Sequence, residues 1–287
     1  MLNLIFILLV NAGILPYDSM GLNGLLLAHT EEGSLYFLDP SDESLTQVIE
    51  PGSTGGGDGL VFDDDGHLYI GEFFGSKISV WSLSAPDDSS GGKLIQAELV
   101  RTLTSASFDN TANVAISGDN VYTVCVRASI PFGDDAFETY QEAFNVIGLN
   151  RNGDVPEGVE QAEEVPIIVS AAEDEIVHVV GKRPEGMITV PGEAIGQEEG
   201  QTYALVSELF YGGINSVNLA TGDVAQVVPS AGFKERGTLG MWYDSDTGII
   251  FAAGGGAYFG TPAKMYAFDA LTGDVVADCS LQSLTFV

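Results

Sequence analysis

Basic residues are scarce in this chain. Ten lysines and arginines stand against 41 acidic residues, which gives a formal net charge of -31. This charge repels phosphate backbones and anionic lipid headgroups, so we expect no nucleic-acid partner and no membrane association beyond a signal peptide. The excess acid has two explanations: a solvated surface that keeps the protein soluble, or acidic side chains that converge on a cation.

Cysteines and the common catalytic signatures are also rare or missing. Cys125 and Cys279 lie far apart in the sequence, which excludes a disulfide framework and leaves no metal-ligand spacing. No Asn-x-Ser/Thr acceptor occurs, so nothing indicates an extracellular glycoprotein. The three histidines are dispersed, and no zinc-protease, serine-hydrolase or phosphate-loop motif is present. Any chemistry must therefore use other groups.

Long apolar runs are absent as well. The run from Leu2 to Val10 is too short to cross a membrane as a helix, but it has the length of the apolar part of a signal peptide. The basic leader of a signal peptide is missing. Residues 1–19 are therefore predicted as an apolar N-terminal segment, either a signal peptide or a truncated strand, and the compartment stays open between secreted and cytoplasmic.

A strand module recurs along the whole chain. Its clearest copies are residues 58–70 and 239–251, each with an apolar strand, an acidic turn that contains glycine, and a second strand. A small antiparallel unit of this kind leaves edges and a face exposed, so copies must pack side by side to bury a core. The pattern predicts an all-β chain with a β-propeller fold.

Strand periodicity divides the chain into five recognisable four-stranded blades plus a stub at 283–287, as in an incomplete six-bladed propeller. The turn at 220–223 is repeated at 271–274, which indicates internal repetition. Besides the N-terminal segment, the predicted parts are blades over residues 20–150, an acidic connection over 151–181, and further blades over 182–287.

Three short segments resemble a known family. Asn23-Gly24-Leu25, Asp58-Gly59-Leu60 and Pro184-Glu185-Gly186 are similar to the blade-start motifs of the senescence marker protein (regucalcin) and gluconolactonase-like superfamily of six-bladed propellers. In that family the Glu-Gly motif opens the first blade, whereas here it follows the other two. The order implies a circular permutant or a fragment. We favour the fragment, because the chain stops where the family's next motif, Asn-Asp, is expected.

The resemblance implies a metal site and an activity. It makes Glu185, Asn23 and Asp58 ligands of a divalent cation, most naturally Ca²⁺ with Mg²⁺ or Mn²⁺ as alternatives, because carboxylate and amide oxygens form a hard ligand shell. It also implies hydrolysis of a small-molecule lactone or related ester, with Asp58 as the candidate general base. The missing Asn-Asp motif leaves this site incomplete and its activity in doubt.

Less specific explanations remain open for these residues. Asn23-Gly24 and Asp58-Gly59 are also typical turn dipeptides, and Glu185 is also explained as an exposed loop acid. The run from Asp63 to Gly66 lacks the spacing of an EF-hand and is predicted as a hairpin turn, with His67 facing solvent. The alternative function is a non-catalytic propeller that serves as a binding or scaffold protein.

Overall fold

The computed structural model describes residues 14–85, 95–126, 145–151, 167–170, 176–179, 184–208, 213–229, 238–256 and 261–280. These residues form strands and one short 3₁₀ helix, η2 (Gly192–Ile195). The described part contains no helix with the length and apolarity that a membrane crossing requires. The stub at 283–287 and the apolar run at 2–10 lie outside the described residues.

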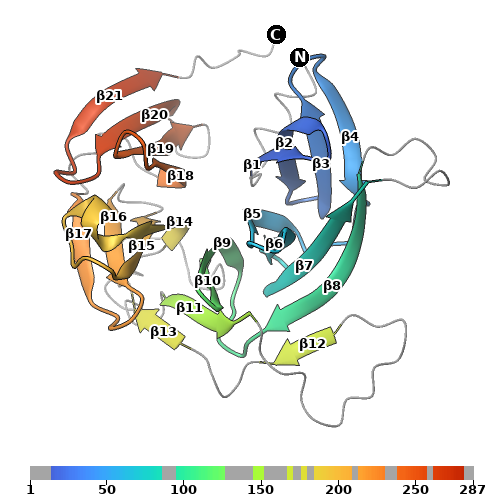
Figure 1. Cartoon of the computed structure of the whole chain (residues 1–287), viewed down its shortest axis with the longest axis horizontal. Helices are drawn as coiled ribbons and strands as arrows, with labels where there is room; N and C mark the ends of the chain where they lie inside the picture. Colours follow the sequence, from blue (N-terminus) through green and yellow to red (C-terminus); the bar gives the residue numbers. More distant parts are fainter. Residues whose placement is uncertain are drawn as a thin grey trace. The chain divides into compact units, whose positions relative to one another are not determined.

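The strands form five sheets, each a blade of the propeller type (Figure 1). The first blade has the order β1-β2-β3-β4. The second has β12-β8-β7-β6-β5, the third β13-β11-β10-β9, the fourth β14-β15-β16-β17, and the fifth β18-β19-β20-β21. The prediction of an all-β β-propeller is confirmed with five blades; the described residues contain no sixth blade.

The strands of the first three blades have the following bounds: β1 (Ile14–Ser19), β2 (Leu22–His29), β3 (Ser34–Asp39), β4 (Ser44–Ile49), β5 (Gly57–Phe62), β6 (His67–Glu72), β7 (Lys77–Ser84), β8 (Gln96–Thr104), β9 (Thr111–Ser117), β10 (Asn120–Cys125), β11 (Asn145–Asn150), β12 (Ile167–Ser170) and β13 (Ile176–Val179). Those of the last two blades are β14 (Pro184–Pro191), β15 (Thr202–Glu208), β16 (Ile214–Asn218), β17 (Val224–Val228), β18 (Thr238–Asp244), β19 (Ile249–Gly256), β20 (Thr261–Asp269) and β21 (Val275–Ser280).

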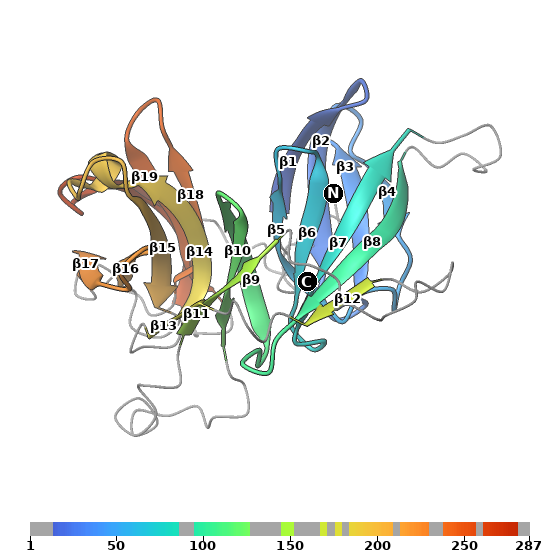
Figure 2. The ribbon, with the colours of Figure 1, turned by 60° about the horizontal axis from the view of Figure 1, so that its bottom comes forward.

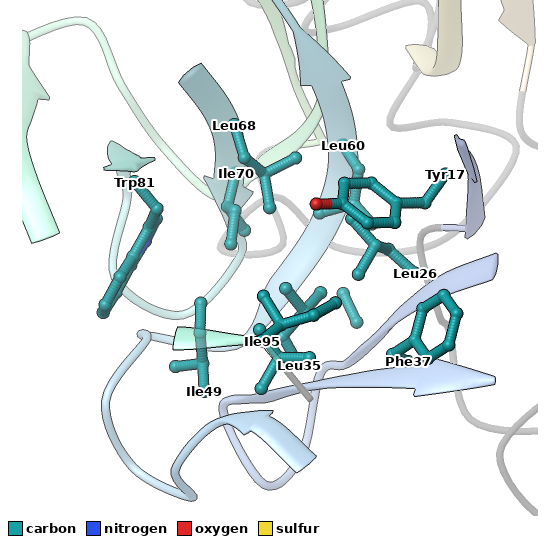
Figure 3. Packing of buried hydrophobic residues seen from close by; sticks show 12 residues of the cluster. Tyr17, Leu26, Leu35, Phe37, Ile49, Leu60, Leu68, Ile70, Trp81 and Ile95 are labelled. Atoms are coloured by element: carbon teal, nitrogen blue, oxygen red, sulfur yellow. The ribbon is translucent and has the colours of Figure 1, made fainter. Parts of the chain in front are cut away.

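The chain divides into two compact units, Met1–Thr123 with Ile147–Ile176, and Val124–Val146 with Val177–Val287. In the first unit, the sheets β1–β4 and β5–β8 lie against each other (Figure 2). Tyr17, Leu26 and Phe37 of one sheet meet Leu60 and residues such as Leu68 and Ile70 of the other in a buried core (Figure 3). This packing follows from the alternation of apolar and polar residues in the strands.

The second unit has a core of its own. Leu205 and Ile214 of blade four pack with Ile250, Tyr266 and Phe268 of blade five, and all five are buried. The turns at 220–223 and 271–274 end equivalent hairpins. In the first turn Asn218 Oδ1 accepts the backbone N–H groups of residues 220 and 221, and in the second Asp269 Oδ1 accepts those of residues 271 and 272. The sequence repeat is therefore a repeat of side-chain-capped turns.

Three observations extend the sequence analysis. Residues 14–19, predicted as part of the N-terminal segment, form β1, and Pro16 fits there because β1 is an edge strand that leaves one side unpaired. The acidic connection contains β12, which pairs in parallel with β8, and β13, which joins the third blade. Both cysteines are free, but Cys125 is buried whereas Cys279 is exposed.

Candidate functional site

Asp58 lies at a β-bulge near the start of β5. The pairs Gly57↔Glu72 and Leu60↔Ile70 enclose Asp58 and Gly59 on one strand but a single residue, Gly71, on the other. A bulge bends its strand and changes the direction of a side chain, and bulges are frequent next to active sites. Asp58-Gly59 is therefore not a turn dipeptide. It is a strand position that holds a half-buried acid.

The same bulge occurs at Glu185 in β14. The pairs Pro184↔Glu208 and Met187↔Val206 leave Glu185 and Gly186 opposite Ser207 alone. The Gly186 N–H, which the bulge removes from the ladder, donates to Ser207 Oγ at 2.8 Å. Glu185 therefore belongs to a strand and not to an exposed loop, and its side chain is half-buried like that of Asp58.

A third bulge shows what the fold itself requires. In β18 the pairs Thr238↔Gly254 and Met241↔Ala252 enclose Leu239 and Gly240 in the same pattern. Leucine stands there at the position of Asp58 and Glu185. Because the bulge forms without an acid, the two carboxylates are not needed for the backbone geometry, which favours a functional reason for them.

Asn23 occupies a different kind of position. It was predicted to open a blade, but β1 precedes it, and it lies exposed in β2 with regular pairing to Asp18. Gly24 beside it is required by packing, because a Cβ there would collide with the Leu38 carbonyl oxygen. The Asn-Gly dipeptide therefore marks neither a blade start nor a turn.

The strand directions separate Asn23 from Asp58. Asp18, the partner of Asn23, lines a cavity together with Phe62 at the end of β5, whereas Asp58 lies near the start of that strand. Four residues of extended chain span roughly 13 Å. Within the first unit, the structure therefore does not bring Asn23 and Asp58 together.

Asn113 of β9 has its amide side chain next to the Asp58 bulge. A Cβ at residue 59 would lie 2.5 Å from Asn113 Cα and 2.9 Å from Asn113 Oδ1. Glycine at position 59 thus lets the first strand of the third blade approach the bulge. Sequence analysis did not identify Asn113 as a site residue; the available signal was its place at the start of a predicted blade.

A buried glutamate accompanies each acidic bulge. Glu72 pairs with Gly57, the residue directly before Asp58, and is fully buried. Its Oε2 atom accepts a hydrogen bond from the Gly55 N–H at 2.5 Å and lies 3.3 Å from Lys77 Nζ. Glu208 pairs with Pro184, directly before Glu185, and its Oε1 accepts the Asn215 amide at 2.8 Å. Sequence analysis missed both, because an acid at the end of an apolar strand gives no sign of its burial.

An aromatic pair lies beside the loop that leads into β5. The rings of Phe73 and Phe74 meet edge to face, with centroids 5.1 Å apart, and Phe74 remains 66% exposed. Their backbone N–H groups donate to the carbonyls of Gly56 and Gly55, each at 2.8 Å. Both residues directly follow β6, the second strand of their blade.

The run from Asp63 to Gly66 forms the predicted hairpin turn. Asp63 Oδ1 accepts the backbone N–H groups of Asp65 at 3.0 Å and His67 at 2.8 Å. Burial by itself raises the pKa of the Asp63 carboxyl. Hydrogen bonds from the His67 backbone N–H, the His67 ring and the Tyr69 hydroxyl outweigh this effect, so the pKa of Asp63 is lowered. Asp63, Asp65 and His67 also have potential ligand atoms within 4.8 Å of one another, so these three residues could hold a metal.

The groups around the Asp58 bulge fit a hard divalent cation. They are oxygen donors: the carboxylate of Asp58 and the amide of Asn113, with the carboxylate of Glu72 on the neighbouring strand opposite Gly57. The Oε1 atom of Glu72 is buried and accepts no hydrogen bond within the described part of the chain. A cation or a water molecule would satisfy this oxygen, whose isolation is otherwise costly.

Comparison with solved structures places the fold among the β-propellers. A streptogramin B lyase structure matches with a TM-score of 0.55 and 11% identity over 96% of this chain and 70% of that one. A gluconolactonase-family protein matches at 0.52 with 13% identity, over 94% and 83% of the two chains. The aldose sugar dehydrogenase of Streptomyces coelicolor, in its PQQ-bound form, matches at 0.52 with 14% identity, over 95% and 81%.

Neither the comparison with protein families nor that with curated proteins gives a match. At these identities the structural likeness establishes the fold alone. The chain is an all-β protein with the β-propeller fold.

Proposed function

We propose that this protein is a divalent-metal-dependent hydrolase of a lactone or related ester. The observation that carries the proposal is a β-bulge made of an acid and a glycine, which contains Asp58 in one blade and Glu185 in another. A third blade forms the same bulge with leucine in place of the acid. The likeness in fold to a gluconolactonase-family protein supports it.

The proposed ligand in the first unit is Asp58, with Ca²⁺ as the cation that suits its oxygens best, and Glu185 in the second unit keeps the ligand role that the resemblance implies. Asn113, which borders the Asp58 bulge, takes the place that sequence analysis gave to Asn23. When bound, the metal would polarise the carbonyl group of the substrate. Asp58 would accept a proton from the attacking water, and the exposed ring of Phe74 would offer an apolar surface to the substrate.

The charge of the chain restricts the substrate class. A net charge of -31 repels anions at long range, so association is faster for a neutral lactone than for a phosphorylated or carboxylated one. A neutral ester or lactone is therefore the expected substrate.

Thermal unfolding with and without millimolar Ca²⁺ tests the metal site. A ligand that binds the folded state stabilises it by about 3 kcal/mol at a hundredfold excess over Kd. We expect this stabilisation in the wild-type protein and in the control Asp246→Asn, which changes an exposed turn acid. We expect its loss in Asp58→Asn and in Glu185→Gln.

Turnover of neutral lactones then separates an enzyme from a scaffold. Hydrolysis that requires Ca²⁺ and disappears in Asp58→Asn supports the proposal. Calcium stabilisation without hydrolysis of any lactone or ester tested would instead indicate the alternative, a metal-stabilised binding protein without catalysis.

A further inference from the structure

Two arginines of this acid-rich chain are linked through Tyr69 and Asp63 in the first unit. Arg101 of β8 donates from Nη2 to the Tyr69 hydroxyl at 2.8 Å. Arg151, which follows β11, places Nη1 3.5 Å from Asp63 Oδ2, and its backbone N–H donates to the Asp119 carbonyl at 2.8 Å. Tyr69 and Asp63 interact with each other, so the four side chains form one cluster, here called the arginine cluster.

Protein acceptors in the described part of the chain satisfy the guanidinium groups of this cluster only in part. Arg101 Nε, Arg151 Nε and Arg151 Nη1 are buried and have no hydrogen-bond acceptor within the described residues. Arg151 Nη1 and Asp63 Oδ2 form an ion pair at 3.5 Å, but their geometry is not that of a hydrogen bond. Buried charged donors without acceptors are costly, which points to a group that supplies acceptors here.

The charge balance indicates the sign of that group. Among the described residues the two guanidinium groups face one buried carboxylate, that of Asp63, since Asp65 beside it is exposed and Tyr69 is a neutral phenol. The buried part of the cluster therefore carries one uncompensated positive charge. A buried charge is tolerated when it is paired, so a monovalent anion fits better than a cation or a neutral group.

We propose that the arginine cluster binds a small monovalent inorganic anion of the size of chloride. The anion would accept hydrogen bonds from Arg101 and Arg151 and would join the second blade to the third. A small ion is required because the three donor atoms are buried, which leaves no access for an organic ligand. This site is separate from the Asp58 bulge and does not depend on the proposed hydrolase function.

Crystals of the wild-type protein grown or soaked in sodium bromide test the site directly. An anomalous bromide peak within hydrogen-bond distance of Arg101 Nε and Arg151 Nε is expected. A map with only a water molecule at this position, or with no density, would overturn the proposal.

Thermal unfolding provides a second test in solution. Sodium chloride and sodium methanesulfonate are compared at equal ionic strength, because any salt screens the self-repulsion of this acidic protein. Chloride is expected to raise Tm by about 2–4 °C more than methanesulfonate does. This difference should vanish in Arg151→Met and persist in Lys264→Met, a control that removes one positive charge elsewhere. Equal Tm values in the two salts for the wild-type protein would contradict the anion site.

Discussion

Gly59 of β5 packs directly against Asn113 of β9, and the contact leaves no room for a side chain at position 59. A Cβ there would lie 2.5 Å from Asn113 Cα and 2.7 Å from the Val114 nitrogen, both backbone atoms that cannot move independently. The approach of two first strands in the first unit therefore depends on this glycine. The same approach brings an amide next to Asp58.

We expect Gly59→Ala to lower the free energy of unfolding by about 1–3 kcal/mol, because overpacking forces the strands apart. The matched control is Gly240→Ala, at the equivalent bulge position in blade five, where a Cβ would meet nothing within 4 Å. Urea unfolding of both variants measures the difference. Equal losses would show that bulge geometry, and not the contact with Asn113, requires the glycine.

Glu72→Gln is expected to lower the free energy of unfolding by about 2 kcal/mol. The substitution weakens charge-assisted hydrogen bonding to the Gly55 N–H and removes the ion pair with Lys77. A double-mutant cycle with Lys77→Met isolates the ion-pair part of this loss. A coupling energy near zero would mean that Glu72 acts through the Gly55 loop alone.

Ser207→Ala should cost about 1–2 kcal/mol, because it leaves the buried Gly186 N–H of the Glu185 bulge without its acceptor at 2.8 Å. Chemical denaturation measures this loss. Ser216→Ala, which removes a hydroxyl whose bond to the Ala225 carbonyl is longer at 3.3 Å, serves as the control and should cost less. A neutral Ser207→Ala would contradict a supporting role of the serine in the bulge.

Asp63 is expected to contribute to the loss of stability in acid. Its pKa is lower in the folded than in the unfolded state, so ionised Asp63 stabilises the fold above the unfolded value of 3.8, and this contribution is lost as pH falls through the folded pKa. Unfolding curves of wild-type protein and Asp63→Asn should therefore converge below about pH 4 and differ at pH 7. A constant difference across this range would show that the carboxylate charge is not involved.

Much of the fold could be predicted from the sequence, because alternating strands and glycine-containing turns depend on local pattern alone. The repeated turns at 220–223 and 271–274 have this origin. β1 was missed because Pro16 and the preceding apolar run obscure its alternation, although proline is acceptable in an edge strand. The five recognisable blades followed from strand periodicity, whereas the six-bladed type expected from the family resemblance is not shown, because the described residues form five blades.

The site was less accessible from sequence, because its features depend on register and on neighbouring strands. The dipeptides Asp58-Gly59 and Asn23-Gly24 look alike in the sequence, but one lies at a bulge and the other in regular pairing. The relevance of Asn113 depends on its contact with a glycine more than fifty residues earlier in the chain. A long-range contact of this kind leaves no local signal.

The two asparagines provide a direct comparison between sequence and structure. If Asn113 and not Asn23 contributes an oxygen to the metal, Asn113→Ala should weaken Ca²⁺ binding by about tenfold, whereas Asn23→Ala should leave it unchanged. Fluorescence competition with a calcium chelator measures both affinities. The opposite order would restore the ligand set that the family resemblance implies.

Calorimetric titration of Ca²⁺ into the wild-type protein and Asp58→Asn tests the central claim most directly. We predict saturable binding to the wild-type protein and to the control Asp246→Asn, and none to Asp58→Asn at the same concentrations. Binding of equal affinity and stoichiometry to all three proteins would contradict a metal site at the bulge of β5.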